Sequence, residues 1–172
     1  RAAILALAVI LGEEQIASVA ERHVDPSRLP EARALRRRIT LYGRGDWPQH
    51  FWVSAGLTLL ADADRSIAVG LTKELMDATP GGSGFSFADL TADAAGNRFA
   101  RAATRDAEAA RALQARIRAG VRLTDYVPEL RDLPEGLSRE EFHGRFGGLG
   151  GAETQRVVDE VRRRLAACPG LE

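Results

Sequence analysis

The sequence is poor in cysteine and has no excess of charge of either sign. Cys168 is the only cysteine in 172 residues, so the chain can form neither an internal disulfide nor a cysteine-based zinc cluster. Basic and acidic residues each number 24, so no overall positive field is available to attract a nucleic-acid backbone. We therefore expect no nucleic-acid partner.

An apolar run of membrane-spanning length is also lacking. The apolar stretch at residues 2–12 falls well short of the ~20 residues that a spanning helix needs. We interpret it as an ordered helix rather than a retained signal peptide, and expect no transmembrane span. Because no initiator Met is present, we expect that the chain begins inside a longer gene product or after processing. Leu171 and Glu172 resemble residues added by an expression vector.

Alternating apolar and polar residues of strand length are absent as well. The apolar spacing instead predicts an all-α fold, a single-domain helical bundle over residues 1–170. The helices at 47–61 and 65–77 should form a central antiparallel hairpin, followed by a long third helix. The expected helices span residues 2–20, 31–40, 47–61, 65–77, 86–119, 138–147 and 152–167.

Capping residues indicate where several of these helices begin. Asp46 before Trp47 and Pro48 predicts a helix N-terminus, because Pro lacks the N–H that has no partner in a first turn. Ser86-x-x-Asp89 and Ser138-x-x-Glu141 have the form of capping boxes. Residues 46–97 form a motif-bearing core, and residues 124–170 form a C-terminal helical extension.

Polar residues recur at helical spacing within this core. Lys73 and Asp77 are four residues apart, as are Asp89 and Asp93, so each pair shares a helix face. Lys73 is the only lysine among the 24 basic residues, which indicates a position where a compact ammonium is preferred to a planar guanidinium. The candidate polar site comprises His50, Lys73, Glu74, Asp77, Ser86, Asp89 and Asp93.

Two interpretations of this site remain open. In the first, Asp77 pairs with Lys73 and Asp89 lies at a helix N-terminus, where the macrodipole favours an anion, so that His50, Glu74 and Asp93 bond to one another. In the second, Lys73 holds an anionic part of a substrate while a divalent cation, which a His and carboxylate set suits, supports a hydrolase-type reaction. The candidate metal ligands are His50, Glu74, Asp77, Asp89 and Asp93.

The order of these motifs resembles a known family. The motifs are Asp46-Trp47-Pro48-Gln49-His50-Phe51, then Lys73-Glu74-x-x-Asp77, then Gly82-Ser83-Gly84-Phe85-Ser86-x-x-Asp89-Leu90-x-x-Asp93-x-x-Gly96. Over about residues 46–97 the sequence resembles the YfiM-type family of predicted bacterial lipoproteins. More distantly it is similar to VanZ-like proteins, which more usually have amide residues where this sequence has Asp77 and Asp93.

This resemblance implies a bacterial cell envelope or periplasmic location, with the cytoplasm as the alternative, and an envelope protein or lipid as partner. It implies no particular reaction. We therefore expect a non-enzymatic, envelope-associated scaffold whose C-terminal segment docks a partner. The alternative is a metal- or anion-binding site that supports hydrolysis of an envelope or lipid substrate.

Overall fold

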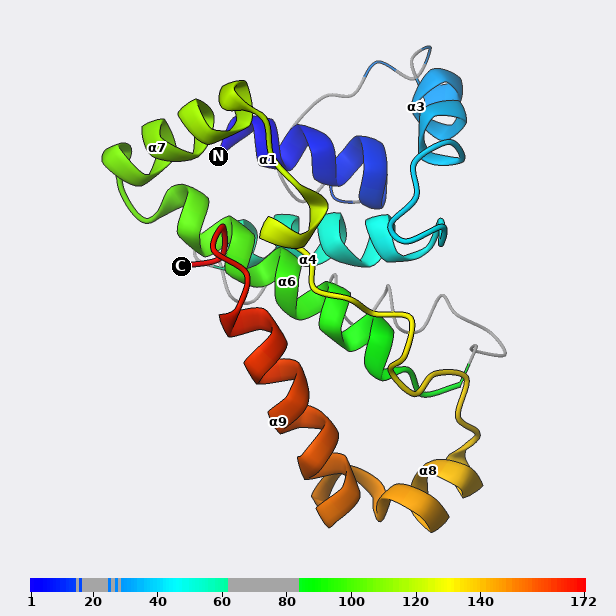
Figure 1. Ribbon diagram of the computed structural model, residues 1–172. Coiled ribbons are helices and arrows are strands. Elements are labelled where there is room, and N and C mark those ends of the chain that lie inside the picture. The colour runs from blue at the N-terminus through cyan, green and yellow to red at the C-terminus, as the bar shows by residue number, and fades with distance from the viewer. Residues whose placement is uncertain (15, 17–24, 26, 28, 62–83) are drawn as a thin grey trace.

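The computed structural model describes residues 1–14, 16, 25, 27, 29–61 and 84–172 (Figure 1). Every regular element in these residues is a helix, which confirms the predicted all-α bundle. None of these described helices is long and apolar enough to cross a membrane. The elements are α1 Ala2–Leu7, the π-helical turn η1 Ala8–Gly12, α3 Leu29–Arg36, α4 Trp47–Ala61, α6 Phe87–Thr104, α7 Ala107–Ala119, the 3₁₀ turn η3 Leu123–Asp125, α8 Arg139–Phe146, the 3₁₀ turn η4 Gly148–Gly150 and α9 Ala152–Ala166.

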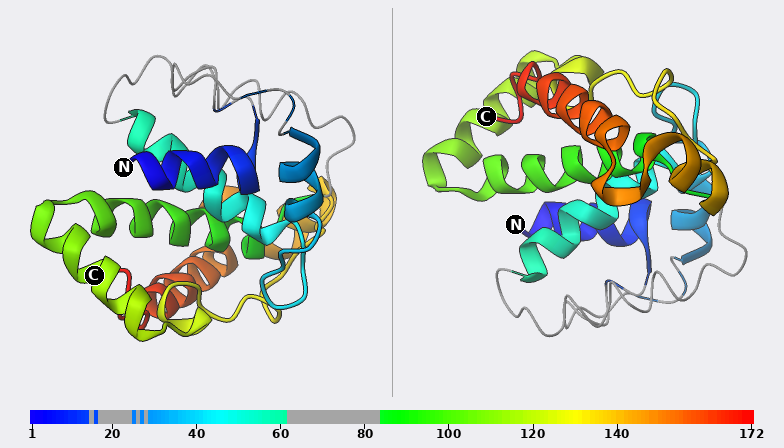
Figure 2. Two further views of the ribbon diagram at one scale, coloured as in Figure 1. Left: turned by 90° about the horizontal axis from the view of Figure 1, so that it is seen from above. Right: turned by 90° about the horizontal axis from the view of Figure 1, so that it is seen from below.

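Helix α4 is the centre of the bundle. It contacts α1, η1 and α6, and Figure 2 shows it crossing α1. On one side Phe51 packs on Phe99 of α6, with 5.5 Å between ring centroids, and on the other Leu60 joins a buried cluster with Ala8 and Ile16. Because a helix that is apolar on both sides must be covered on both sides, α4 accounts for the order of the layers.

Helices α4 and α6 run in the same direction. Trp47, in the first turn of α4, contacts Asp89 in the first turn of α6, and Trp52 contacts Phe99 further along both helices. The partners thus advance together along the two sequences. The expected antiparallel partner of α4, the helix at 65–77, lies outside the described residues.

Several predicted boundaries are confirmed. Helix α4 spans Trp47–Ala61, as the sequence indicated. The capping box at the start of α8 forms in both directions: the Ser138 hydroxyl accepts a hydrogen bond from the Glu141 amide, and the Ser138 amide donates to the Glu141 carboxylate. Gly147 ends α8 in the left-handed conformation, with φ 71°. Helix α9 ends at Ala166, within one residue of the expected end.

The helix expected after Ser86 runs through Ala103 as predicted, but its expected continuation to Ala119 is wrong, because the helix is broken between Thr104 and Ala107 and α7 begins there. Asp106 adopts an extended backbone, and its carboxylate accepts a 2.7 Å hydrogen bond from the Ala109 amide. This side chain therefore caps a new helix instead of continuing the old one, which is the competition expected of Asp inside a helical sequence.

The two N-terminal helices also differ from their predicted bounds. The helix expected at 2–20 is interrupted after Gly12, where Glu13 turns to an extended backbone and its carboxylate accepts a hydrogen bond from Gln49. Residues 17–20 of the expected helix lie outside the described residues. The next residue, Glu14, forms an ion pair with Arg33 at 2.7 Å. Helix α3 begins two residues before the expected Glu31 and ends at Arg36 rather than Thr40. None of its residues is buried, which agrees with the predicted surface position.

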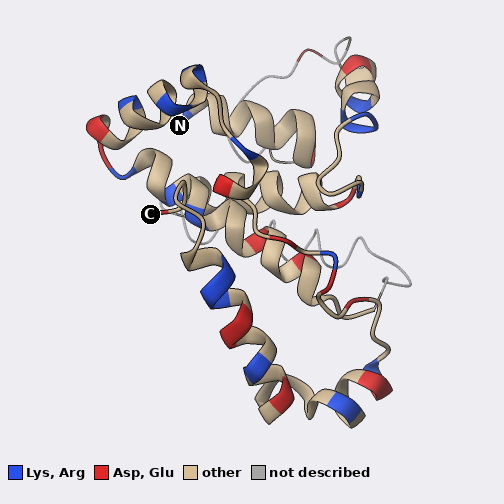
Figure 3. Ribbon diagram, viewed as in Figure 1, with Lys and Arg blue, Asp and Glu red and all other residues tan. Residues whose placement is uncertain are grey.

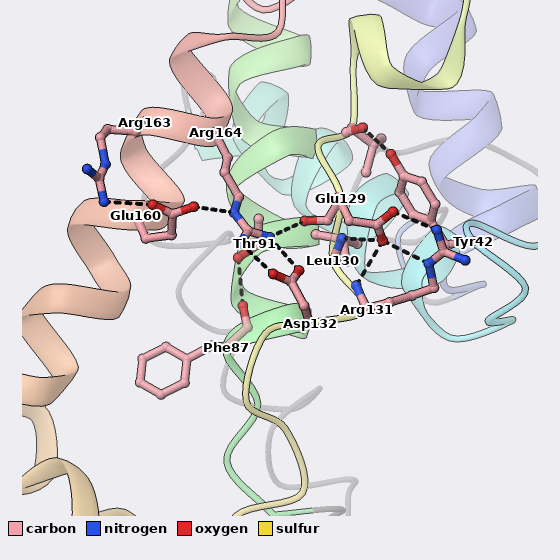
Figure 4. Close-up of polar contacts among 11 residues, drawn as sticks. Tyr42, Phe87, Thr91, Glu129, Leu130, Arg131, Asp132, Glu160, Arg163 and Arg164 are labelled. Atoms are coloured by element: carbon pink, nitrogen blue, oxygen red, sulfur yellow. Dashed lines mark hydrogen bonds and ion pairs between the residues drawn. The ribbon is translucent and has the colours of Figure 1, made fainter.

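Arg164 joins α9 to the connector that precedes α8. Arg164 of α9 donates to both carboxylate oxygens of Asp132, at 2.6 and 2.7 Å, to the carbonyl oxygen of Glu129 and to Glu160 (Figure 4). Beyond α9, Cys168 and Leu171 are buried in the main core. Leu171, interpreted above as a vector residue, is thus a packed side chain with 7% exposure.

Candidate functional site

The structure describes His50, Ser86, Asp89 and Asp93 of the predicted polar site, whereas Lys73, Glu74 and Asp77 lie outside the described residues. The described members come from two helices. His50 lies in the first turn of α4, and the others lie at the cap and in the first two turns of α6. The parallel packing of these helices brings the four residues together.

His50 lies between two carboxylates of α6. Its Nδ1 is 3.3 Å from Oδ1 of Asp93, and its Nε2 is 3.7 Å from Oδ2 of Asp89. The His50 side chain is 38% exposed, and those of Asp89 and Asp93 are 18% and 34% exposed. An imidazolium can donate from both ring nitrogens, whereas a neutral imidazole can donate from only one. The arrangement therefore favours the protonated ring.

Two further donors on α4 complete the contact. The Trp47 indole N–H donates to Asp89 at 3.1 Å, and the Ser54 hydroxyl donates to Asp93 at 2.8 Å. Trp47, His50 and Ser54 are spaced three and four residues apart, so they lie on one face of α4. This set, with Asp89 and Asp93, is called the His50 cluster below. The contacts of Trp47 and Ser54 were not predicted, although their helical spacing with His50 is visible in the sequence.

The predicted role of Asp89 needs correction. Ser86 caps α6 as expected, since its hydroxyl accepts a 3.0 Å hydrogen bond from the Asp89 amide. The carboxylate of Asp89, however, faces α4, where it binds Trp47 and approaches His50. Asp89 therefore joins two helices in addition to lying at a helix N-terminus. The expected approach of His50 to Asp93 is confirmed.

The electrostatics identify Asp93 as the main partner of His50. The hydrogen bond to Asp93, together with the charges of Asp93, Asp89 and Asp46, raises the pKa of His50 above its ordinary value, although burial opposes this. Partial burial raises the pKa of Asp89, against the charge of His50 and the hydrogen bonds with Ser86 and Trp47. Because the Asp89 charge is disfavoured by burial and lies farther from the ring, Asp93 makes the larger contribution to the raised pKa of His50.

An arginine network borders the cluster. Arg44 donates to both carboxylate oxygens of Asp46, pairs with Glu135 at 2.7 Å, and lies 5.0 Å from the centre of the Trp47 ring. Burial raises the pKa of Asp46, but the Arg44 hydrogen bonds and charge lower it by a larger amount, so that the net shift is downward. Arg44 thus joins the start of α4 to the connector that carries Glu135.

The His50 cluster does not form a metal site by itself. Asp89 and Asp93 approach opposite ring nitrogens of His50, so the three side chains do not converge on one point. Among the described residues, no group of three or more His, Cys, Asp or Glu side chains is arranged to hold a metal ion. The other two candidate ligands, Glu74 and Asp77, lie outside these residues.

Comparison of the chain with protein-family models, with curated proteins and with solved structures finds no match. The chemistry of the site therefore has to be judged from its own geometry.

Proposed function

We propose that this chain is a non-enzymatic, envelope-associated helical scaffold in which the His50 cluster fixes α4 against α6. The observation that carries the proposal is that both ring nitrogens of His50 face carboxylates of the neighbouring helix. Trp47 and Ser54 donate to the same two carboxylates. These polar groups are thus already hydrogen-bonded or ion-paired with one another between the helices.

Catalysis would need a different arrangement. A general base must present a free ring nitrogen to its substrate, and a serine nucleophile must donate its proton to that base. The Ser54 hydroxyl instead donates to Asp93, and each nitrogen of His50 lies beside a carboxylate. Cys168 is buried, which raises the pKa of its thiol and makes it a poor nucleophile.

The envelope part of the proposal is supported by the resemblance of residues 46–97 to YfiM-type lipoproteins. In that pattern, His50 of α4 contacts both Asp89 and Asp93 of α6. A fourth residue of the pattern, Gly96, lies directly against the backbone of α4. The shared pattern thus has a packing role that requires no reaction. The proposed partner is an envelope protein or lipid.

A metal titration tests the scaffold against the hydrolase alternative. A ligand that binds only the folded state raises the melting temperature by mass action. We expect Mg²⁺, Mn²⁺ and Zn²⁺, each added after treatment with a chelator, to leave the melting temperature of the chain unchanged. A rise that is abolished by both His50→Ala and Asp93→Asn would favour the metal site over the scaffold.

Cell fractionation tests the location. The full-length gene product, expressed with an epitope tag in a bacterial host, should be recovered with the envelope or periplasmic fraction. Recovery with the cytosolic fraction alone would contradict the envelope part of the proposal, while leaving the packing role of the cluster intact.

A further inference from the structure

A hollow lined by arginines lies at the C-terminal end of α6, on residues outside the His50 cluster. Its volume is about 560 Å³, and its lining includes Arg98 and Arg101 of this helix and Arg105 at its C-cap, together with Arg1 and Glu172. Figure 3 shows the blue turns of α6 near both chain ends. Pockets of roughly 300–1,000 Å³ commonly hold small ligands.

Two arginines of α6 and the arginine at its C-cap share one face. Arg98, Arg101 and Arg105 are separated by three and four residues, the spacing that places side chains one above another. Arg101 and Arg105 are exposed, and Arg98 is half-buried. They therefore present three guanidinium groups to one hollow, called the arginine hollow below.

Carboxylates neutralise these arginines only weakly. Within the described part of the chain Arg98 forms no ion pair, and the Arg101 Nε donates to the uncharged amide of Asn97. Arg105 lies 3.4 Å from Asp106. Arg164, by contrast, meets two carboxylates at 2.6 and 2.7 Å. Glu172 is the single carboxylate side chain among the lining residues.

The helix termini do not cancel this positive charge. The C-terminal end of a helix carries a partial negative charge, which on its own would repel an anion. Here α6 ends at Thr104 and α7 begins at Ala107, so two helix ends of opposite partial charge lie close together, and the Asp106 carboxylate already caps the α7 end. Four arginines and one carboxylate side chain line the hollow, so the charged side chains set its sign.

We propose that the arginine hollow binds the phosphate group of a small phosphorylated ligand. The planar guanidinium matches a phosphate through paired hydrogen bonds, and three of them suit a dianion. The apolar part of the lining, Ala102 and Leu171, suits the uncharged remainder of such a ligand. The phosphate can belong to a soluble ester or to a phospholipid headgroup, since both present the same group.

Calorimetric titration with glycerol 3-phosphate tests the soluble source, and co-sedimentation with phosphatidylcholine vesicles, with and without phosphatidic acid, tests the lipid source. We expect saturable binding in at least one of the two assays. Binding in the first identifies a soluble ester, and binding only to vesicles containing phosphatidic acid identifies a headgroup. Absence of binding in both assays overturns the proposal.

Matched charge variants distinguish the hollow from a diffuse arginine-rich surface. The double variant Arg98→Gln/Arg101→Gln should weaken binding by about tenfold or more, the factor expected for a lost charge-assisted hydrogen bond. The control Arg111→Gln/Arg118→Gln removes the same charge from exposed positions of α7 and should leave the affinity nearly unchanged. Equal weakening by both variants overturns the assignment to the hollow.

A second variant keeps the test valid if the double variant unfolds. Glu172→Gln removes the lining carboxylate from an exposed position without touching a helix. Because that carboxylate repels a phosphate, we expect tighter binding than in the wild type. Unchanged or weaker binding by Glu172→Gln contradicts the proposal.

Discussion

Gly96 of α6 lies directly against the carbonyl group of Phe51 of α4, and a Cβ atom at position 96 would overlap that oxygen. The close approach has a consequence one turn earlier on α6. There Asp93 lies within hydrogen-bonding reach of His50 and Ser54. A glycine in a helix interior thus sets the separation at which the His50 cluster can form.

Gly96→Ala should therefore destabilise the fold. In an unobstructed helix, replacing Gly by Ala gains about 1 kcal/mol, but overpacking of a close helix contact costs about 1–3 kcal/mol. We expect a net loss of folding free energy, measured by urea unfolding. Gly144→Ala in α8 is the matched control, because a Cβ there meets nothing within 4 Å, and it should be neutral or stabilising. Equal effects of the two substitutions would argue against the close contact.

Asp89→Ala should cost more than Asp89→Asn. Removing the carboxylate leaves the N–H of Trp47, a residue with 1% exposure, without its acceptor, and such a loss costs about 1–3 kcal/mol. Asparagine retains an acceptor oxygen. Glu108→Ala, in the first turn of α7, controls for the general helix-dipole effect and should change the melting temperature little. Asp89→Ala and Glu108→Ala variants of equal melting temperature would contradict the interhelical role of Asp89.

Arg164→Gln should weaken the attachment of α9 to the connector that carries Glu129 and Asp132. The substitution removes the paired hydrogen bonds to Asp132 and the bond to the Glu129 carbonyl, while Asp132 remains partly solvated. We expect a loss of about 1 kcal/mol, and faster amide hydrogen exchange in α9. Arg163→Gln is the neighbouring control, since the Arg163 side chain is 76% exposed and pairs with Glu160 of its own helix. Exchange in α9 should stay at the wild-type rate in that variant.

The stability of the chain should fall as pH rises past neutrality, and His50 should account for part of the fall. Its pKa is raised in the folded state, so its contribution is fully present below the unfolded value of 6.5 and is lost as pH rises through the higher folded value. We expect the melting temperature of His50→Gln to decline less than that of the wild type from about pH 6 to pH 9. Parallel curves would show that His50 does not stabilise the fold by protonation.

Local signals predicted the helix ends that the structure confirms. Trp47–Ala61 was predicted from Asp46 and Pro48, and the start of α8 from the Ser138 and Glu141 pair. Each depends on groups within one helical turn, so the sequence contains the whole interaction. The break at Asp106 is also local, but the Ala-rich sequence on both sides of it favours a helix. The sequence pattern therefore predicted one continuous helix.

Contacts between helices were less predictable. Helical spacing placed Asp89 and Asp93 on one face, and His50 was expected near Asp93. That the Asp89 carboxylate faces Trp47 depends on the parallel packing of α4 and α6, which no spacing within either helix determines. The arginine hollow depends in the same way on how Arg1, Leu171 and Glu172 lie beside α6.

A pH titration of His50, monitored by the NMR chemical shifts of its two ring nitrogens, tests most directly whether the His50 cluster fixes α4 against α6. We expect a pKa above the ordinary value of 6.5, with both nitrogens protonated below it, and a lower pKa in the Asp93→Asn variant because that substitution removes the dominant negative charge. A pKa at or below 6.5 that Asp93→Asn leaves unchanged would contradict the proposed packing role of the His50 cluster.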